Sequence, residues 1–126
     1  MWPVRSKRIC KHVRERLEAD VPLYLGRFKY SAEAMQAMIE NPHDRGALAA
    51  EAAESLGCKL RGIWWSFGDH DGVFLLEAPD NAAVVALAMA VGASGQISTE
   101  TTALLDMEEA QEAMRRAATA TFRPPR

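Results

Sequence analysis

Residues 58–78 read Cys58-Lys-Leu-Arg-Gly-Ile-Trp-Trp-Ser-Phe67, then Gly68-Asp-His-Asp-Gly72, then Val73-Phe-Leu-Leu-Glu-Ala78. The first and third segments are rich in aromatic, β-branched and other apolar residues, which is typical of strands. The Gly- and Asp-rich segment between them has the composition of a tight turn. The stretch therefore predicts a β-hairpin, around which the other elements can be placed.

Two helices and a strand are predicted on the N-terminal side of this hairpin. Residues 22–30 alternate in character and predict a strand. Ser31 is a favourable N-cap for a helix over residues 32–40. Asn41, with Pro42 in the first helical position, predicts a second helix that ends near residue 56.

The C-terminal side completes a known arrangement. Asp80 predicts the N-cap of a helix that ends near residue 93, and residues 96–105 predict a Thr-rich strand. Asp106 and Glu109 have the spacing of a capping box ahead of a last helix, which ends near residue 118. The order β-α-β-β-α-β with a C-terminal helix predicts a ferredoxin-like α+β fold, with a four-stranded antiparallel sheet and helices on one face.

The hairpin strands carry large apolar side chains on both faces. Simple alternation places Cys58, Leu60 and Trp64 on one side and Ile63, Trp65 and Phe67 on the other. A sheet with one solvated face would instead be polar on that face. We therefore expect a second copy to cover it around a two-fold axis, as a homodimer or larger even oligomer resembling a dimeric α+β barrel. The alternative is that the C-terminal helix and the N-terminal segment fold back over the face.

Composition limits the classes of protein to which the chain can belong. Its 126 residues suit one domain, and 48% apolar with 25% charged residues exclude wholesale disorder. A net charge of −2 argues against a dedicated nucleic-acid binder, and no apolar run is long enough to cross a membrane. Cys10 and Cys58 form neither a metal-site spacing nor a disulfide framework. We expect a cytoplasmic protein with no metal and no cofactor.

Residues 1–20 differ from the rest of the chain in charge, with six basic and three acidic side chains. Residues 5–16 could be a basic arm that binds nucleic acid, or a disordered tail. The third hypothesis is that translation naturally begins at Val21 and that the first 20 residues do not belong to the natural protein. The predicted organisation is an extension over 1–20, one domain over 21–118 and a disordered tail over 119–126.

The hairpin turn and the first strand hold the candidate catalytic groups. His70 could be a general base that Asp69 or Asp71 orients, although a histidine in a plain turn is usually solvated. Arg27 could hold an anionic ligand, or it could pair with a carboxylate on a neighbouring strand.

Three aromatic residues could line a ligand pocket: Trp64, Trp65 and Tyr24. The alternative for the two tryptophans is that one is core and the other is interface. The sequence contains none of the strong phosphate-loop, nucleophile-elbow or zinc-protease motifs.

Several segments in the right order resemble the GYD family of small bacterial proteins. The resemblance covers about residues 21–117 and rests on Pro22–Ser31, Glu40–Arg45, Gly57–Leu60, Gly68–Val73, Glu77–Asp80, Ala93–Gly95, Thr101-Thr102, Leu104-Leu105 and Glu108–Ala110. It implies a ferredoxin-like fold and an association like that of dimeric α+β barrels, but no reaction. His70 stands where the family usually has tyrosine, and Cys58 stands where glycine is common.

Two functions follow as expectations. The first is a homo-oligomeric module that binds a small apolar or anionic molecule or serves assembly. The alternative is a cofactor-independent enzyme of oxygenase or isomerase type, with a pocket between the sheet and the helices, in which His70 is the base, Asp71 orients it, Arg27 holds an anionic substrate and Trp64 lines the pocket.

Overall fold

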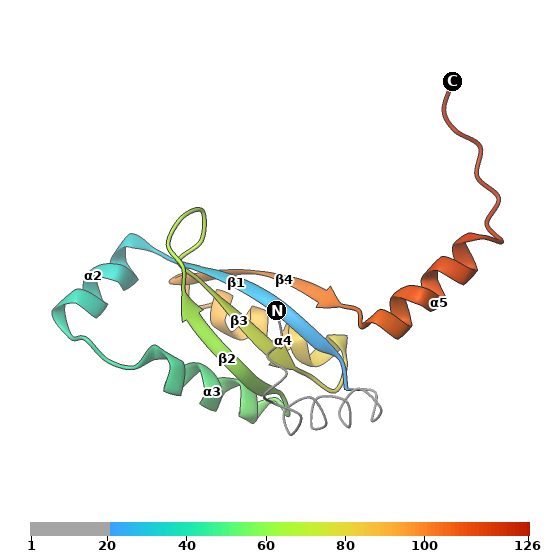
Figure 1. The fold of residues 1–126 in the computed structure, drawn as a ribbon. Coiled ribbons are helices and arrows are strands. Elements are labelled where there is room, and N and C mark those ends of the chain that lie inside the picture. Colours follow the sequence, from blue (N-terminus) through green and yellow to red (C-terminus); the bar gives the residue numbers. More distant parts are fainter. Residues whose placement is uncertain (1–20) are drawn as a thin grey trace, which may run out of the picture.

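The computed structural model describes residues 21–126, which form a single antiparallel sheet and four helices (Figure 1). The hypotheses for residues 1–20 lie outside the described residues. The elements follow in the order β1 (Leu23–Tyr30), α2 (Ala32–Glu40), α3 (Arg45–Ser55), β2 (Lys59–Trp65), β3 (Gly72–Glu77), α4 (Asn81–Gly92), β4 (Ile97–Leu104) and α5 (Met107–Ala117). Residues 119–126 contain no helix or strand.

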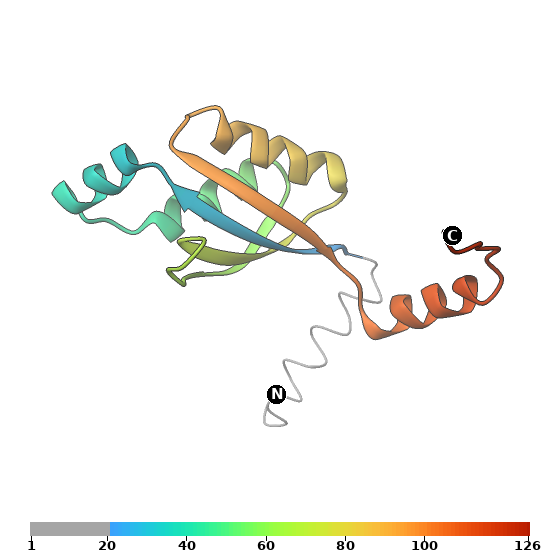
Figure 2. The same cartoon turned by 90° about the horizontal axis from the view of Figure 1, so that it is seen from above.

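The strand order β2-β3-β1-β4, with every neighbouring pair antiparallel, confirms the predicted ferredoxin-like α+β fold. Helices α3 and α4 cover one face of this sheet, whereas α5 extends away from the body of the domain (Figures 1 and 2). We call the covered side the helix face and the other side the open face. No described helix is long and apolar enough to cross a membrane.

Side-chain caps set the start of each described helix. Ser31, Asp80 and Asp106 cap α2, α4 and α5 as the sequence predicts, and Asp106 forms the full capping box with Glu109.

The prediction for α3 is wrong by three residues. Asp44 is its N-cap, and the Asp44 carboxylate accepts hydrogen bonds from two backbone N–H groups, those of Gly46 and Ala47. Asn41 instead closes α2, because its own N–H donates to the Ala37 carbonyl. An Asp that satisfies two helix-start donors outcompetes an Asn–Pro start.

A β-bulge in β2 corrects the predicted faces of the hairpin. The register shifts between Leu60 and Gly62, so Leu60, Ile63 and Trp65 all lie opposite helix-face residues of β3. Trp64 lies on the open face. Simple alternation placed Leu60 and Trp64 together, which is wrong because the extra residue at the bulge reverses the side of everything after it.

The buried core is small and lies between the helix face and the two covering helices. Its centre is Leu76, which has no exposed surface, packed among Tyr24, Ala53, Cys58 and Val84. Burial, together with the Asp80 carboxylate, raises the pKa of the Cys58 thiol. Cys58 is therefore a neutral core residue at physiological pH.

Two phenylalanine rings lie over two glycines at the middle of the sheet. Gly26 on β1 pairs with Phe74 on β3, and Phe28 pairs with Gly72 in the reciprocal arrangement. A Cβ atom on Gly26 would lie 1.9 Å from the Phe74 ring, and one on Gly72 would lie 2.2 Å from the Phe28 ring. Each ring therefore occupies the space that a side chain on the partner glycine would need.

We predict that Gly26→Ala lowers the free energy of unfolding by about 1–3 kcal/mol, the usual cost of overpacking, because the Phe74 ring must move. Gly92→Ala is the matched control, since no atom lies within 4 Å of its added methyl group. Urea unfolding of both variants measures the difference. Equal stabilities of the two variants would contradict the close packing described here.

Candidate functional site

The β2–β3 loop is fixed to β1 by Asp71. Its backbone N–H donates to the Phe28 carbonyl at 2.8 Å, and its Oδ2 accepts from the Tyr30 N–H at 2.8 Å. The Asp71 carbonyl also accepts from the Ser66 N–H at 2.9 Å, which closes the loop on itself. Asp71 is buried, and these bonds give it a structural part that sequence reasoning did not foresee.

His70 contacts a different carboxylate from the one expected. Its Nε2 lies 2.9 Å from Oε2 of Glu100 on β4, 30 residues away along the chain. The prediction that Asp71 orients His70 is therefore corrected, because Asp71 binds the backbone of β1 instead. Glu100 alternates with Thr99 and Thr101 of the helix face, so the His70–Glu100 pair lies on the open face.

Arg27 also lies on the open face, directly across from Glu100 and Val73 in the strand register. The two acidic residues that the neighbouring strands place on this face have other partners: Glu100 contacts His70, and Glu77 lies 3.1 Å from Arg61. Among the described residues, the Arg27 guanidinium forms no ion pair. This end of the open face thus carries a cation beside a histidine–carboxylate pair.

The two tryptophans lie on opposite faces of the sheet. Trp64 is 55% exposed on the open face, with its ring over Gly62. Trp65 lies at the end of the helix face, where its ring centre is 5.5 Å from that of Tyr30 and 5.4 Å from that of Phe67. They therefore cannot line one pocket within a single chain.

Tyr24 is buried in the core and does not face a ligand cavity. Its hydroxyl donates a hydrogen bond to Oδ1 of Asn81, the first residue of α4. The bond joins the start of β1 to the start of α4. Tyr24 thus positions a helix that forms one wall of the cavity described next.

A cavity of about 80 Å³ lies between the helix face and helices α3 and α4. Its walls are almost entirely apolar and include Phe28, Ile63, Phe74, Ala52, Leu87 and Val91. The lining residues with polar groups in their side chains are Tyr30, Thr99 and Thr101. None of the six predicted site residues lines this cavity. The signal in the sequence was the alanine content of both helices, whose short side chains leave space unfilled.

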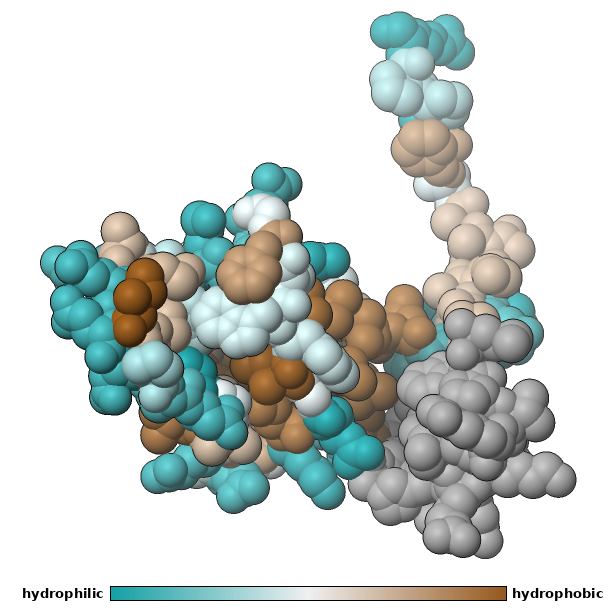
Figure 3. Space-filling model, turned by 60° about the vertical axis from the view of Figure 1, so that its left-hand side comes forward, coloured by the Kyte–Doolittle hydropathy of each residue, from teal (hydrophilic) through white to brown (hydrophobic). Residues whose placement is uncertain are grey.

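The open face carries a second group of apolar side chains. The strand register places Leu23, Leu25, Trp64, Val73, Leu75 and Leu104 on it. In the described part of the chain no helix covers this face. Apolar residues also gather on the surface seen from the α2 side, with hydrophilic residues around them (Figure 3).

Residues 21–126 bring no three histidine, cysteine, aspartate or glutamate side chains together as metal ligands. The described residues place an apolar cavity on one face of the sheet and an imidazole–carboxylate pair beside Arg27 on the other. The sheet separates the two, so one small molecule cannot contact both within one protomer.

We predict that Asp71→Ala lowers the free energy of unfolding by about 1–3 kcal/mol, because it leaves the Tyr30 N–H without its buried acceptor. His70→Ala removes a pair whose glutamate is largely exposed and should cost less than about 1 kcal/mol. Denaturant unfolding of both variants checks this order. If His70→Ala were the more damaging change, the structural part assigned to Asp71 would be wrong.

Comparison with known protein families matches residues 24–114 to the GYD domain. No curated protein matches the chain. The match begins at Tyr24 in β1 and extends to Met114 in α5, so it includes all four strands, the His70 loop and most of the last helix. The chain therefore belongs to the GYD domain family.

Proposed function

We propose that the chain is a homo-oligomeric module that binds a small apolar molecule in the cavity between the sheet and helices α3 and α4. The observation that carries this proposal is the cavity itself. An apolar pocket of about 80 Å³ that is partly open to solvent leaves its lining side chains without packing partners, at a cost in stability. A domain with so small a core retains that cost more readily if a ligand offsets it.

The lining of the cavity indicates the class of ligand. An apolar cavity of about 150 Å³ takes up benzene or xenon, so this one suits a molecule of a few heavy atoms or the end of a longer apolar group. The hydroxyls of Tyr30, Thr99 and Thr101 could bond one polar atom of that molecule. An anionic group is not matched here, because Arg27 lies on the other side of the sheet.

The homo-oligomer in this proposal is supported by the open face. Its apolar residues would be costly to leave in water, at about 25 cal/mol for each Å². A second copy, the same sheet related by a two-fold axis, offers a complementary apolar surface. A cytoplasmic setting fits the unpaired Cys58 thiol.

We predict that xenon or benzene shifts the methyl NMR signals of Ile63, Leu87 and Val91 in a saturable titration. Ala88→Leu fills the cavity, because Ala88 lines it. It should abolish these shifts and raise the free energy of unfolding by about 1–2 kcal/mol. Ala90→Leu, on the exposed side of the same helix, is the matched control and should keep the shifts. Equal titrations of both variants would rule out the cavity as the binding site.

A cofactor-independent enzyme of oxygenase or isomerase type is the second candidate, and the 2.9 Å contact between His70 and Glu100 favours it. A carboxylate that fixes an imidazole is the arrangement of an oriented general base. Such an enzyme would bind its substrate on the open face, near Arg27 and Trp64, and not in the cavity.

For this candidate we predict that a compound found to be consumed by the protein is consumed about 10²–10⁴-fold more slowly by His70→Ala. Glu100→Gln, which keeps the shape but not the charge, should slow it less. Mass spectrometry of substrate depletion measures both rates. Turnover that survives His70→Ala unchanged would remove His70 from the chemistry.

A further inference from the structure

Helix α5 stands apart from the rest of the domain. It continues from the end of β4 away from the body (Figure 1), on the side of the sheet away from α4 (Figure 2). None of its 11 residues is buried. An isolated helix of this length is marginal in water, and most helices owe their stability to packing of an apolar face. The described residues, 21–126, therefore supply no packing partner for α5.

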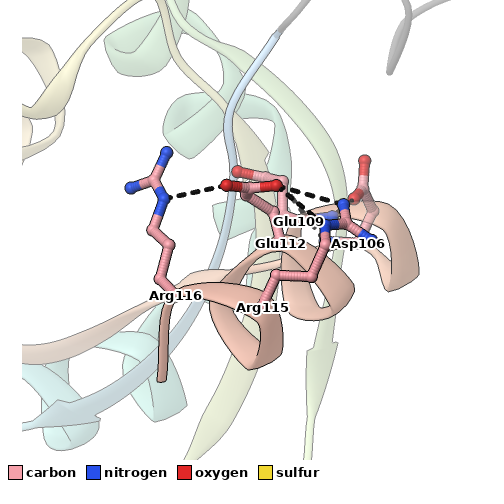
Figure 4. Close-up of polar contacts among 5 residues, drawn as sticks. All are labelled: Asp106, Glu109, Glu112, Arg115 and Arg116. Carbon is pink, nitrogen blue, oxygen red and sulfur yellow. Dashed lines mark hydrogen bonds and ion pairs between the residues drawn. The ribbon is translucent and has the colours of Figure 1, made fainter. Parts of the chain in front are cut away.

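Several charged side chains of α5 form hydrogen bonds and ion pairs with one another. Glu112 accepts from Arg115 at 3.1 Å and from Arg116 at 3.0 Å, while Asp106 and Glu109 close the capping box (Figure 4). These interactions set the helix and its direction, but at exposed positions they contribute little to stability. They do not account for the apolar residues on the other side of the helix.

The other side of α5 carries an apolar stripe at helical spacing, formed by Met107, Ala110, Met114 and Ala117. Met107 is 77% exposed and Met114 is 67% exposed. Methionine side chains adapt to irregular apolar surfaces and are frequent where helices dock. The stripe thus has the composition of an interface.

We infer that the apolar stripe of α5 packs on the open face of a second copy of this chain, and that α5 of the second copy packs in the same way on the first. We call this reciprocal contact the clasp. The inference rests on the homo-oligomer proposed above and names the element that holds it. In this arrangement the two sheets meet over the apolar centre of their open faces. Each α5 covers the partner's basic end, where Arg27 and Lys29 lie.

Three observations favour a second copy over another partner. The GYD domain match extends through Met114, so most of α5 belongs to the same domain although it does not pack on it. The helix leaves the sheet on the side away from α4, which is where the open face lies (Figure 2). The third observation is that α5 begins with an acidic turn, whereas the open face carries the basic side chains of Arg27 and Lys29.

Complementary charges on α5 and the open face lack partners within the described chain. Glu108 lies in the acidic first turn of α5 and forms no ion pair there. Arg27 and Lys29 on β1 form none with the described residues either. A contact between the first turn of α5 and the partner's β1 would pair these charges. Such ion pairs become stronger when the interface excludes water, because the local dielectric constant falls.

The test measures the dimer dissociation constant by analytical ultracentrifugation of the full chain. Met107→Gln/Met114→Gln should weaken the dimer by at least about tenfold. Arg115→Gln/Arg116→Gln, on the charged side of the same helix, should change it little. Because α5 is not buried in its own protomer, the stripe variant should keep its fold, and circular dichroism verifies this.

A charge-reversal cycle locates the clasp on the open face. Arg27→Glu and Glu108→Arg should each weaken the dimer by about tenfold, and the two together should restore most of the affinity. In the unmodified chain, amide hydrogen exchange in α5 should slow as the protein concentration rises.

The outcomes separate the two proposals. A dimer that keeps its affinity in the stripe variant would overturn the clasp and leave the homo-oligomer standing. A charge reversal without rescue would also overturn the placement of α5 on the partner's open face. A chain that stays monomeric at every concentration would overturn both the clasp and the homo-oligomer, but it would leave binding in the cavity to be decided by the xenon titration.

Discussion

A four-stranded sheet with apolar side chains on both faces needs two covers, and the described chain supplies one. Helices α3 and α4 cover the helix face, where Leu76 is fully buried. On the other face, Leu25 on β1 is paired with Leu75 on β3, and Val73 lies two residues away along β3. No helix in the described part of the chain covers these three side chains. The proposals for the open face and for α5 both follow from this missing second cover. We propose that a second copy covers the open face, and α5 has no packing partner among the described residues.

The side chains on the helix face leave part of the space under the helices unfilled. Rings of Phe28 and Phe74 lie over Gly72 and Gly26, so the middle of the sheet is flat and aromatic. The helices above it present mainly alanine and valine, which are too short to reach the rings everywhere. The cavity is the space left between a flat aromatic floor and short helical side chains. The same glycines that let the strands pack thus create the site proposed to bind a small apolar molecule.

Local signals predicted most of the fold, and long-range contacts decided the rest. Caps such as Asp80 and Asp106 act within one helical turn, so the sequence around them suffices to place α4 and α5. The bulge between Leu60 and Gly62 depends on pairing with β3, and simple alternation therefore assigned Trp64 to the wrong companions.

The candidate site was less predictable for the same reason. The composition of its turn identified His70, but its partner Glu100 lies on β4, 30 residues further along the chain. The adjacent Asp71 carboxylate accepts a hydrogen bond from the backbone of β1 instead. The cavity depends on how side chains from distant segments pack together, so no local sequence motif identifies it. The alanine content of α3 and α4 is the sequence signal for it, and the sequence prediction did not use that signal.

The cover of the open face by a second copy can be tested by isotope-filtered NMR on a mixture of labelled and unlabelled chains, since this experiment detects only contacts between copies. We expect intermolecular contacts from the Trp64 ring and from the methyl groups of Leu25, Val73 and Leu75. Intermolecular contacts confined to other surfaces, or none at all, would contradict it.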